Sequence, residues 1–422
     1  MLRALEHRNY RIFISGQLVS LIGTWMQSVA QAWLVYRLTG SAVLLGAVGF
    51  ASQIPVFLMA PVGGLFADRH DRRRILIATQ SASMVLALVL GTLTLTERIE
   101  VWHILVLASL LGIANGFDIP TRQAFVAEIV GRADLLNAIA LNSSMFNGAR
   151  IVGPAIAGVV VAAVGEGWCF VGNGLSYVAV LTGLVAIRHP ARIVVRSGAG
   201  ALAEASEGIR FAAGTPPVKA LLLLLGLVSL TGMPYAVLMP VMAANVLGVG
   251  ATGLGVLMGA SGAGALLGAL SLARRGTTRG LGHWVARAAA GFGLSLVLFS
   301  LSRWYWLSIL LLLPVGFSMM IQMSSSNTLI QSMVPDRLRG RVMAVYSMMF
   351  MGMAPFGALL AGMAAERIGA PWTIAAGGVL SVAGAAVFRA RLPIIGPAAS
   401  RLIIAQEAGA GEPAQERTGT GA

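Results

Sequence analysis

The sequence is poor in cysteine and in charge. Its 422 residues include a single cysteine, Cys169, which excludes an intrachain disulfide and any paired-cysteine metal or redox site. Charged residues make up only 11% of the chain, against about 25% in soluble proteins, while hydrophobic residues reach 57%. Such a chain cannot cover itself with polar surface, and its mean hydropathy of +0.81 indicates a protein surrounded largely by lipid.

Sequence motifs for nucleotide or metal chemistry are also absent. There is no G-x-x-x-x-G-K-[ST] loop, which excludes an ATP-hydrolysing P-loop site in this chain. There is also no H-E-x-x-H motif or Cys/His cluster that would bind a metal. The net charge of +14 comes from basic residues scattered singly between apolar runs, so it does not indicate nucleic-acid binding. We therefore expect neither an enzyme nor a cofactor, and we expect membrane lipids as surroundings.

Apolar runs of membrane-spanning length fill the chain. About 20 helical residues cross a hydrocarbon core about 30 Å thick. Twelve runs reach this length and predict an all-α membrane protein. They cover residues 12–36, 42–67, 75–95, 102–122, 137–164, 168–187, 219–245, 250–273, 281–301, 304–331, 340–364 and 371–390.

The basic residues between the spans fall mostly on one side of the membrane. Counted outside the spans, only Arg37, Arg98, Arg303 and Arg367 lie on the other side. The positive-inside rule therefore places both termini in the cytoplasm. Tryptophans favour membrane interfaces, and five of them map to the outer ends of spans: Trp102, Trp168, Trp304, Trp306 and Trp372.

The sequence divides into two related halves. A shift of 204 residues places Met145-Phe146 on Met349-Phe350, and it also places Gly64 on Gly268. We expect six-span halves at 1–187 and 219–392, a cytoplasmic linker at 188–218 with a short amphipathic stretch at 202–213, and a disordered cytoplasmic tail at 393–422. Two such halves, with a substrate site between them at mid-membrane, are typical of a transporter that works by alternating access.

Several motifs resemble those of the major facilitator superfamily. The stretch Gly64-Leu-Phe-Ala-Asp68-Arg69-His-Asp71-Arg72-Arg73-Arg74 resembles its loop 2–3 motif, with Asp71 in place of the usual glycine. Three further segments resemble the enterobactin-exporter and macrolide-efflux-like branch of this superfamily. They are Gly23-Thr-Trp25-Met-Gln27-Ser-Val-Ala-Gln31-Ala-Trp33, Asp118-Ile-Pro120-Thr-Arg122-Gln123 and Arg339-Gly340-Arg341-Val-Met-Ala344. This branch also resembles lysophospholipid transporters.

The resemblance covers about residues 8–392. It implies a monomeric secondary transporter of a bacterial inner membrane that exports an amphipathic small molecule, such as a siderophore or a drug-like compound, in exchange for protons. Two alternatives remain open. One is translocation of a lysophospholipid or another solute, including uptake. The other, of a different class, is a membrane receptor or scaffold that transports nothing and has no polar cavity.

The loop 2–3 motif suggests a latch. Gly64 and Asp68 share one face of the second span, where a glycine admits a neighbouring helix and a carboxylate favours that helix's N-terminus. By resemblance the neighbour begins near Gly340. We expect Asp68, with Arg69 and Arg72, to latch the cytoplasmic side in the outward-open state. The alternative is a basic loop that only sets topology.

Glycines of the fifth and eleventh spans suggest close helix packing. Gly153, Pro154 and Gly158 resemble an antiporter motif of the superfamily, G-P-x-x-G-G, with Ala157 replacing a glycine. Gly153 and Gly158 have repeat partners in Gly357 and Gly362, and the same shift pairs Gly148 with Gly352. Small residues let helix backbones approach in lipid, either for rocking or for static packing.

Few charges lie inside the predicted spans. Asp118 and Arg122 are four residues apart at the inner end of the fourth span and can pair on one face, either as a proton site or as a local salt bridge. Arg150 lies midway along the fifth span, where it costs at least about 2.5 kcal/mol. We expect it to face the central cavity, where it binds an anionic substrate group or gates the proton path. The alternative is snorkelling or pairing near the inner face.

Uncharged side chains complete the expected cavity. Gln27, Gln31, Trp25 and Trp33 on the first span and Asn147 on the fifth would suit a bulky amphipathic ligand. The alternative for each amide is a hydrogen bond between helices. Met319, Met320, Met323 and Gln322 form either a pliable wall or ordinary helix packing.

Overall fold

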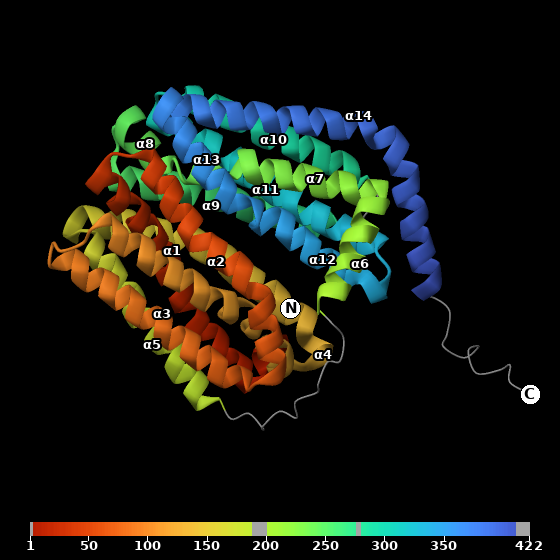
Figure 1. Cartoon of the computed structure of the whole chain (residues 1–422), viewed down its shortest axis with the longest axis horizontal. Helices are drawn as coiled ribbons and strands as arrows, with labels where there is room; N and C mark the ends of the chain where they lie inside the picture. Colours follow the sequence, from red (N-terminus) through yellow and green to blue (C-terminus); the bar gives the residue numbers. More distant parts are fainter. Residues whose placement is uncertain (1–2, 188–200, 276–279, 411–422) are drawn as a thin grey trace, which may run out of the picture.

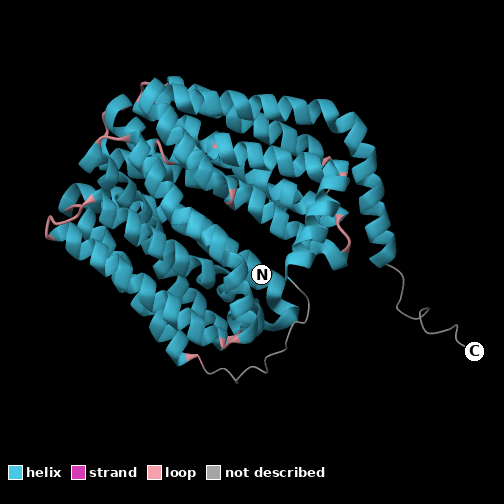
Figure 2. Cartoon of the chain, viewed as in Figure 1, coloured by secondary structure: helices cyan, strands magenta, loops and turns pink. Residues whose placement is uncertain are grey.

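The protein is built from helices joined by short turns. The computed structural model describes residues 3–187, 201–275 and 280–410 (Figure 2). Within these residues twelve helices are long and apolar enough to span a membrane, and no strand occurs. The prediction of an all-α membrane protein with twelve spans is confirmed.

The N-terminal half holds six spans in five continuous helices. They are preceded by η1 (Arg3–Glu6) and comprise α1 (Arg8–Thr39), α2 (Ala42–Arg69), α3 (Arg72–Leu95), α4 (Val101–Val164) and α5 (Glu166–Ala186). α4 contains two spans, because Gly131 adopts a φ of 76°, a left-handed conformation that favours glycine and turns the chain. We call Val101–Gly131 its first arm and Ala133–Val164 its second arm.

The C-terminal half follows a linker helix, α6 (Ala201–Gly214), at the place of the expected amphipathic stretch. Its elements are α7 (Pro216–Thr231), η2 (Met233–Ala236), α8 (Met239–Val241), η3 (Met242–Val246), α9 (Gly250–Arg275), α10 (Leu281–Leu301), α11 (Tyr305–Met333), α12 (Asp336–Met351), α13 (Met353–Ile368) and α14 (Ala370–Ala410).

Two spans of the C-terminal half are interrupted, which the apolar runs did not indicate. The span expected at 219–245 breaks after Thr231, where Pro234 and Pro240 lack the N–H that a continuous helix needs. The span expected at 340–364 breaks at Gly352, between α12 and α13.

The prediction of a disordered tail from residue 393 is wrong for residues 393–410. α14 continues through Pro393 and Pro397 to Ala410 and bends across the inner end of the C-terminal half (Figure 1). Its continuation packs because Ile395 is buried and Leu402 contacts the hydrophobic core. An overall Ala/Gly/Glu-rich composition hid this apolar face. Residues 411–422, and residues 188–200 of the predicted linker, lie outside the described residues.

The two halves lie side by side, with α1–α5 in one bundle and α7–α14 in the other (Figure 1). They meet mainly along two seams, the second arm of α4 against α9 and α2 against α13. Both seams depend on glycine. A Cβ on Gly158 would lie 3.0 Å from the Thr252 carbonyl oxygen, and one on Gly362 would lie 2.6 Å from that of Ala42.

The seams show where equivalent residues of the two halves are 204 residues apart, as in the sequence repeat, and where this offset differs. Gly158 and Gly362 are 204 residues apart and make equivalent contacts, as the sequence predicts. In the partner helices, however, the equivalent glycines are Gly46 and Gly255. Their added Cβ atoms would lie 2.5 and 2.4 Å from the carbonyl oxygens of Ala358 and Pro154, respectively.

Gly46 and Gly255 are 209 residues apart, so the expected match of Gly64 with Gly268 is wrong. A Cβ on Gly64 would meet nothing within 4 Å, whereas one on Gly268 would lie 2.7 Å from the Phe317 carbonyl oxygen. The two glycines therefore have different surroundings.

Glycines of the fourth and tenth spans show where the register changes. Gly112 and Gly316 are 204 residues apart, and each packs closely against a serine carbonyl oxygen of a neighbouring helix. Those serines, Ser52 and Ser261, are 209 residues apart. The N-terminal half therefore has more residues between its second and fourth spans than the C-terminal half has between the equivalent spans.

The halves are closed at one end and apart at the other. Contacts between them involve the ends of α2 and α13 near Ala42 and run as deep as Arg150, whose carbonyl oxygen would lie 2.9 Å from a Cβ on Gly262. Nearer the opposite end, a cavity of 520 Å³ separates α2 and the first arm of α4 from α12. By the expected topology this is an inward-open arrangement.

The five tryptophans expected at outer ends share one end of the molecule. All are more than half exposed, and all lie at the closed end, at the start of α4, α5, α11 or α14. Exposed indole rings at one level are typical of a membrane interface. We refer below to this closed end as the outer end.

The glycine seam makes a prediction about the outer seal. Gly46→Ala places a Cβ against the backbone of Ala358, so α2 and α13 must separate and the space behind this seam becomes accessible from outside. Ser28 of α1 lines a cavity there, together with residues of α2. A membrane-impermeant thiol reagent, added to intact cells, should label Ser28→Cys several-fold faster in this background. Cys169 is buried.

The matched control is Gly64→Ala on the same helix, where an added Cβ meets nothing. It should leave external labelling unchanged. Equal labelling in both backgrounds would contradict the role of the seam.

Candidate functional site

A cavity of 360 Å³, which we call the central cavity, lies between the middle of the spans and the closed end and is lined mainly by the N-terminal half. Its walls come from α1, α2, the first arm of α4 and α5, with Ala236, Val237 and Met258 contributed by the C-terminal half. Several lining residues carry amides or hydroxyls: Thr24, Gln27, Ser28, Gln31, Ser52, Gln53 and Asn173. Polar groups within a largely apolar wall suit an amphipathic ligand.

Of the uncharged side chains expected in the cavity, Trp25, Gln27 and Gln31 line it. Trp33 does not, because it packs against the hydrophobic core. Asn147 is buried and donates to the Ser143 carbonyl oxygen within its own helix, at 2.9 Å. Trp33 and Asn147 therefore do not line the cavity, and the prediction that they do is wrong.

The two glutamines differ in what they leave for a ligand. Asn173 donates to Gln27 Oε1 at 2.7 Å, so this buried amide joins α5 to α1, as the alternative interpretation proposed. Gln31 makes no hydrogen bond within the described residues, and its amide is available to a ligand.

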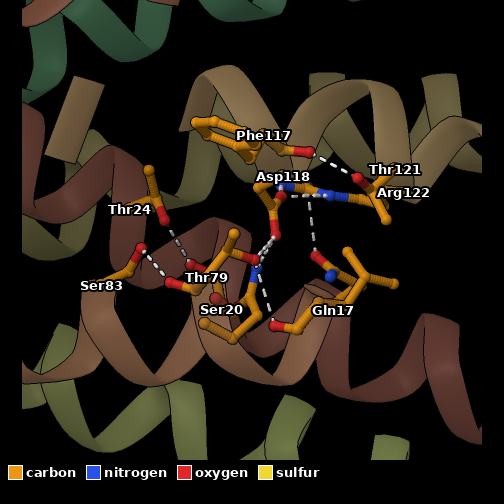
Figure 3. A network of polar contacts seen from close by, with 11 residues as sticks. Gln17, Ser20, Thr24, Thr79, Ser83, Phe117, Asp118, Thr121 and Arg122 are labelled. Atoms are coloured by element: carbon orange, nitrogen blue, oxygen red, sulfur yellow. Dashed lines mark hydrogen bonds and ion pairs between the residues drawn. The ribbon is translucent and has the colours of Figure 1, made fainter. Parts of the chain in front are cut away.

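Asp118 lies at the centre of a buried polar network (Figure 3). Its Oδ1 accepts hydrogen bonds from Thr79 at 2.9 Å and from Gln80 at 2.7 Å, both on α3. Its Oδ2 pairs with Arg122, whose Nε lies 2.9 Å away, and Arg122 Nη1 also donates to Gln17 on α1 at 3.3 Å. The expected pair therefore forms, and it joins three helices.

Sequence reasoning identified Asp118 and Arg122 but not the roles of Gln17, Thr79 and Gln80. The available signal was that polar side chains are rare in these spans and cost free energy there without a partner. With all these donors in place, the carboxylate is only 1% exposed and fully hydrogen-bonded.

The repeat does not reproduce this charge in the other half. The 204-residue shift relates the first arm of α4 to α11, where Gln322 and Ser326 replace Asp118 and Arg122. Gln322 Nε2 and the Ser326 hydroxyl are buried without a hydrogen-bond partner among the described residues. Among the described residues, the pair of Asp118 and Arg122 therefore has no charged equivalent in the C-terminal half.

Arg150 projects from the second arm of α4 into the boundary between the halves. Its Nη2 lies 4.0 Å from Met319 Sδ on α11, and its guanidinium carbon lies 5.9 Å from the centroid of the Trp25 ring on α1. It forms no ion pair with any described residue. Arg150 is not among the residues that line the central cavity, so the expectation that it faces this cavity stays a prediction. Met319 is buried in the hydrophobic core, as the alternative of ordinary helix packing expects.

The expected latch is disengaged at the inner end. Asp68 is 56% exposed and accepts only from Arg72, on the following helix, at 3.3 Å, while Arg69 is exposed. Arg72 also donates to Glu128 at 3.0 Å. Gly340 resembles Gly64 in that an added Cβ would meet nothing within 4 Å.

The fourth span is longer than predicted and therefore also contains Glu128. It continues to Gly131 instead of ending near residue 122, and near its inner end Glu128 pairs with Arg72 at 3.0 Å. Asp71, which stands where the loop 2–3 motif usually has glycine, has a structural role. Its side chain caps α3 by accepting a hydrogen bond from the backbone N–H of Arg73 at 2.9 Å.

The start of α12, where Asp68 was expected to dock, contacts the linker helix instead. Glu207 of α6 pairs with Arg337 at 3.2 Å and with Arg341. A Cβ on Gly208 would lie 2.8 Å from the Arg341 carbonyl oxygen, so α6 lies directly on α12. The linker helix is therefore attached to the C-terminal half.

Polar contacts also tie the halves at the outer end. Glu366 of α13 accepts from the backbone N–H of Ala42 at 3.1 Å, at the N-terminus of α2. Asn245 donates to the Tyr36 hydroxyl at 2.5 Å. Within the N-terminal half, Arg37 pairs with Glu166 at 2.7 Å. The sequence indicated only that these residues lie in outer loops or at span ends.

The Asp118 network makes a prediction about stability. Arg122→Gln leaves a buried carboxylate without its counter-charge and should lower the free energy of unfolding by about 3–5 kcal/mol. The double variant Asp118→Asn/Arg122→Gln should recover most of this loss, because both charges are removed. The measurement is denaturant unfolding of the purified protein in detergent.

Arg74→Gln is the matched control, since the Arg74 side chain is 88% exposed. Its stability should equal that of the wild type. If Arg122→Gln also matched the wild type, the network would not be important for the fold.

Known proteins share both the sequence pattern and the fold. The chain is 26% identical to the staphyloferrin A transporter of Staphylococcus aureus over 90% of this chain and 95% of that protein. It is 28% identical to the multidrug efflux pump Tap of Mycolicibacterium fortuitum, covering 85% and 89%. It is 25% identical to the enterobactin exporter EntS of Shigella boydii, covering 81% of each.

A solved structure of a mutant of the nucleoside transporter NupG has the same fold, with a TM-score of 0.69 and 13% identity over 91% of this chain and 99% of that one. The described residues contain no group of three His, Cys, Asp or Glu that could hold a metal.

A family model described as "Transmembrane secretion effector" matches residues 2–407. The protein is therefore a multi-pass membrane transporter rather than an enzyme, and it belongs to the transmembrane secretion effector family of the major facilitator superfamily.

Proposed function

We propose that this protein exports amphipathic small molecules across a bacterial inner membrane by alternating access, in exchange for protons. The observation that carries the proposal is the central cavity, in which amides and hydroxyls from α1, α2 and α5 interrupt an apolar wall. Its volume of 360 Å³ lies within the range of about 300–1,000 Å³ that suits drug-sized ligands. Relatives named as siderophore and drug exporters support the outward direction.

The topology of the proposal has both termini in the cytoplasm. In the present arrangement the cavity would load from the inside, while glycine seams and the Glu366 contact close the outer end. Rocking of the halves would break these contacts and form new ones near Gly64 and Gly340. Both glycines have open space for such an approach.

We assign proton coupling to the Asp118 network. A proton on Asp118 removes the charge that Arg122, Thr79 and Gln80 now compensate. Because these partners lie on α3 and α4, and Arg122 also contacts α1 through Gln17, protonation would loosen the packing of three helices at once. The energy source would thereby act on helices that line the cavity.

The first test is transport into everted vesicles with and without a proton gradient, screened over siderophores, macrolides and lysophospholipids. Asp118→Asn should remove stimulation by the gradient while downhill substrate exchange continues. Glu97→Gln makes an equivalent chemical change on an exposed carboxylate at the outer end and should behave as wild type.

Undiminished gradient stimulation in Asp118→Asn would refute the assignment of the proton site. Transport of lysophospholipids alone would favour the lipid translocator. Failure to move any compound under any gradient would favour a receptor or scaffold.

The latch gives a second test. If Asp68 docks at the N-terminus of α12 in the outward-open state, Asp68→Asn should depopulate that state by a factor of about three to thirty, the worth of a charge at a helix terminus. Transport should fall accordingly while the amount of protein in the membrane stays constant.

Arg74→Gln changes a charge in the same loop and is the control, because its exposed side chain pairs only with Asp71. Normal transport by Asp68→Asn, measured in the same vesicles, would leave the loop with a topological role only.

A further inference from the structure

The positive charge of Arg150 has no counter-charge among the residues that the structure describes. It lies at mid-membrane, yet its described contacts are a methionine sulfur and the face of an indole ring. Neither carries a negative charge, and a cation–π contact replaces only part of the hydration that a guanidinium loses. A charged group in this position is stabilised fully only when an anion or water reaches it.

The surroundings of Arg150 are flat and apolar. Phe146 lies one helical turn before Arg150 and is 44% exposed. Its ring meets the edge of Trp25, with 5.6 Å between centroids and 71° between planes. Trp25 also lines the central cavity. Arg150 and Phe146 are not lining residues themselves and lie beyond Trp25. A ligand that extends from the cavity past Trp25 therefore meets a cation and two aromatic rings next to one another.

These three groups define the chemistry of what they bind. A guanidinium presents paired N–H donors in a plane, which match the two oxygens of a carboxylate or a comparable oxyanion. Aromatic side chains pack with planar rings in offset or edge-on arrangements. The three side chains are thus complementary to a planar ring that bears an anionic oxygen group.

We propose that Arg150, Trp25 and Phe146 form a binding site for an aryl or conjugated oxyanion, so that the transported compounds are selected for negative charge. The site rests on the proposed transport function and deepens it by naming its substrate class. The amides of the adjoining cavity hold the uncharged remainder of the substrate.

The position of Arg150 lets both halves respond to the anion. Met319 of the C-terminal half contacts its side chain, and Gly262 of the same half packs near its backbone. These contacts lie deep in the seam between α4 and α9. An anion that draws the guanidinium toward the cavity changes contacts at the place where the halves separate.

The test measures binding to the purified full chain in detergent, independently of transport. The probes are 1-naphthoate, 1-naphthalenemethanol and 1-naphthylmethylamine, which share one ring system and differ in charge. Equilibrium dialysis should show that wild-type protein prefers the anion by about 10- to 100-fold over the alcohol, the usual gain from a charged hydrogen bond. The amine should bind no better than the alcohol.

Two variants localise the preference. Arg150→Gln should abolish it by lowering the affinity for the anion to that for the alcohol, and binding of the alcohol that is still measurable shows that the variant is folded. Arg150→Lys should keep part of the preference, since it retains the charge without the paired donors. Gln31→Ala is the control within the cavity and should weaken all three probes alike.

Equal affinities for the three probes in the wild type, no binding of any probe, or a preference that survives Arg150→Gln would each overturn the proposal. The vesicle experiments fail or succeed separately. An anion preference without transport would refute the transport function alone, and transport without an anion preference would refute this site alone.

Discussion

The cost of a charge in hydrocarbon is the constraint on which this structure depends. Asp118 meets it through donors on α3 and through Arg122, and Arg122 in turn reaches α1. The equivalent place in α11 avoids the cost with neutral side chains. Arg150, by contrast, has no countercharge from the described residues, at the boundary between the halves. The two halves therefore share an architecture but differ in chemistry, and we assign titration and anion recognition to the first of them.

Glycine provides the mechanical counterpart of that chemistry. In lipid no hydrophobic force draws helices together, so contact between halves requires close backbone approach. At Gly46 and Gly362 the approach is made at the outer end, whereas Gly64 and Gly340 have space that is unused in this arrangement. A small set of backbone contacts can thus be exchanged between the two ends without repacking either bundle.

The number of spans, their division into halves and the expected pair of Asp118 and Arg122 could be predicted because each depends on local pattern or helical spacing. The partners Thr79 and Gln80 could not, since they lie on another helix whose rotation is set by packing. The offset of 209 residues between the second and eighth spans was hidden by chance matches of small residues. The helical continuation of α14 past Pro393 was missed because average composition conceals the apolar face that Ile395 begins.

The lone charge of Arg150 also exposes the protein to the electric field of the membrane. Moving one elementary charge through a full potential of 100 mV changes the free energy by about 2.3 kcal/mol, and a partial displacement changes it in proportion. When the halves rock, any movement of Arg150 along the membrane normal is work done with or against that field. A bound anion cancels the charge and with it the work. The voltage across the membrane would then bias the return of the empty carrier, but it would not affect the movement of the loaded carrier.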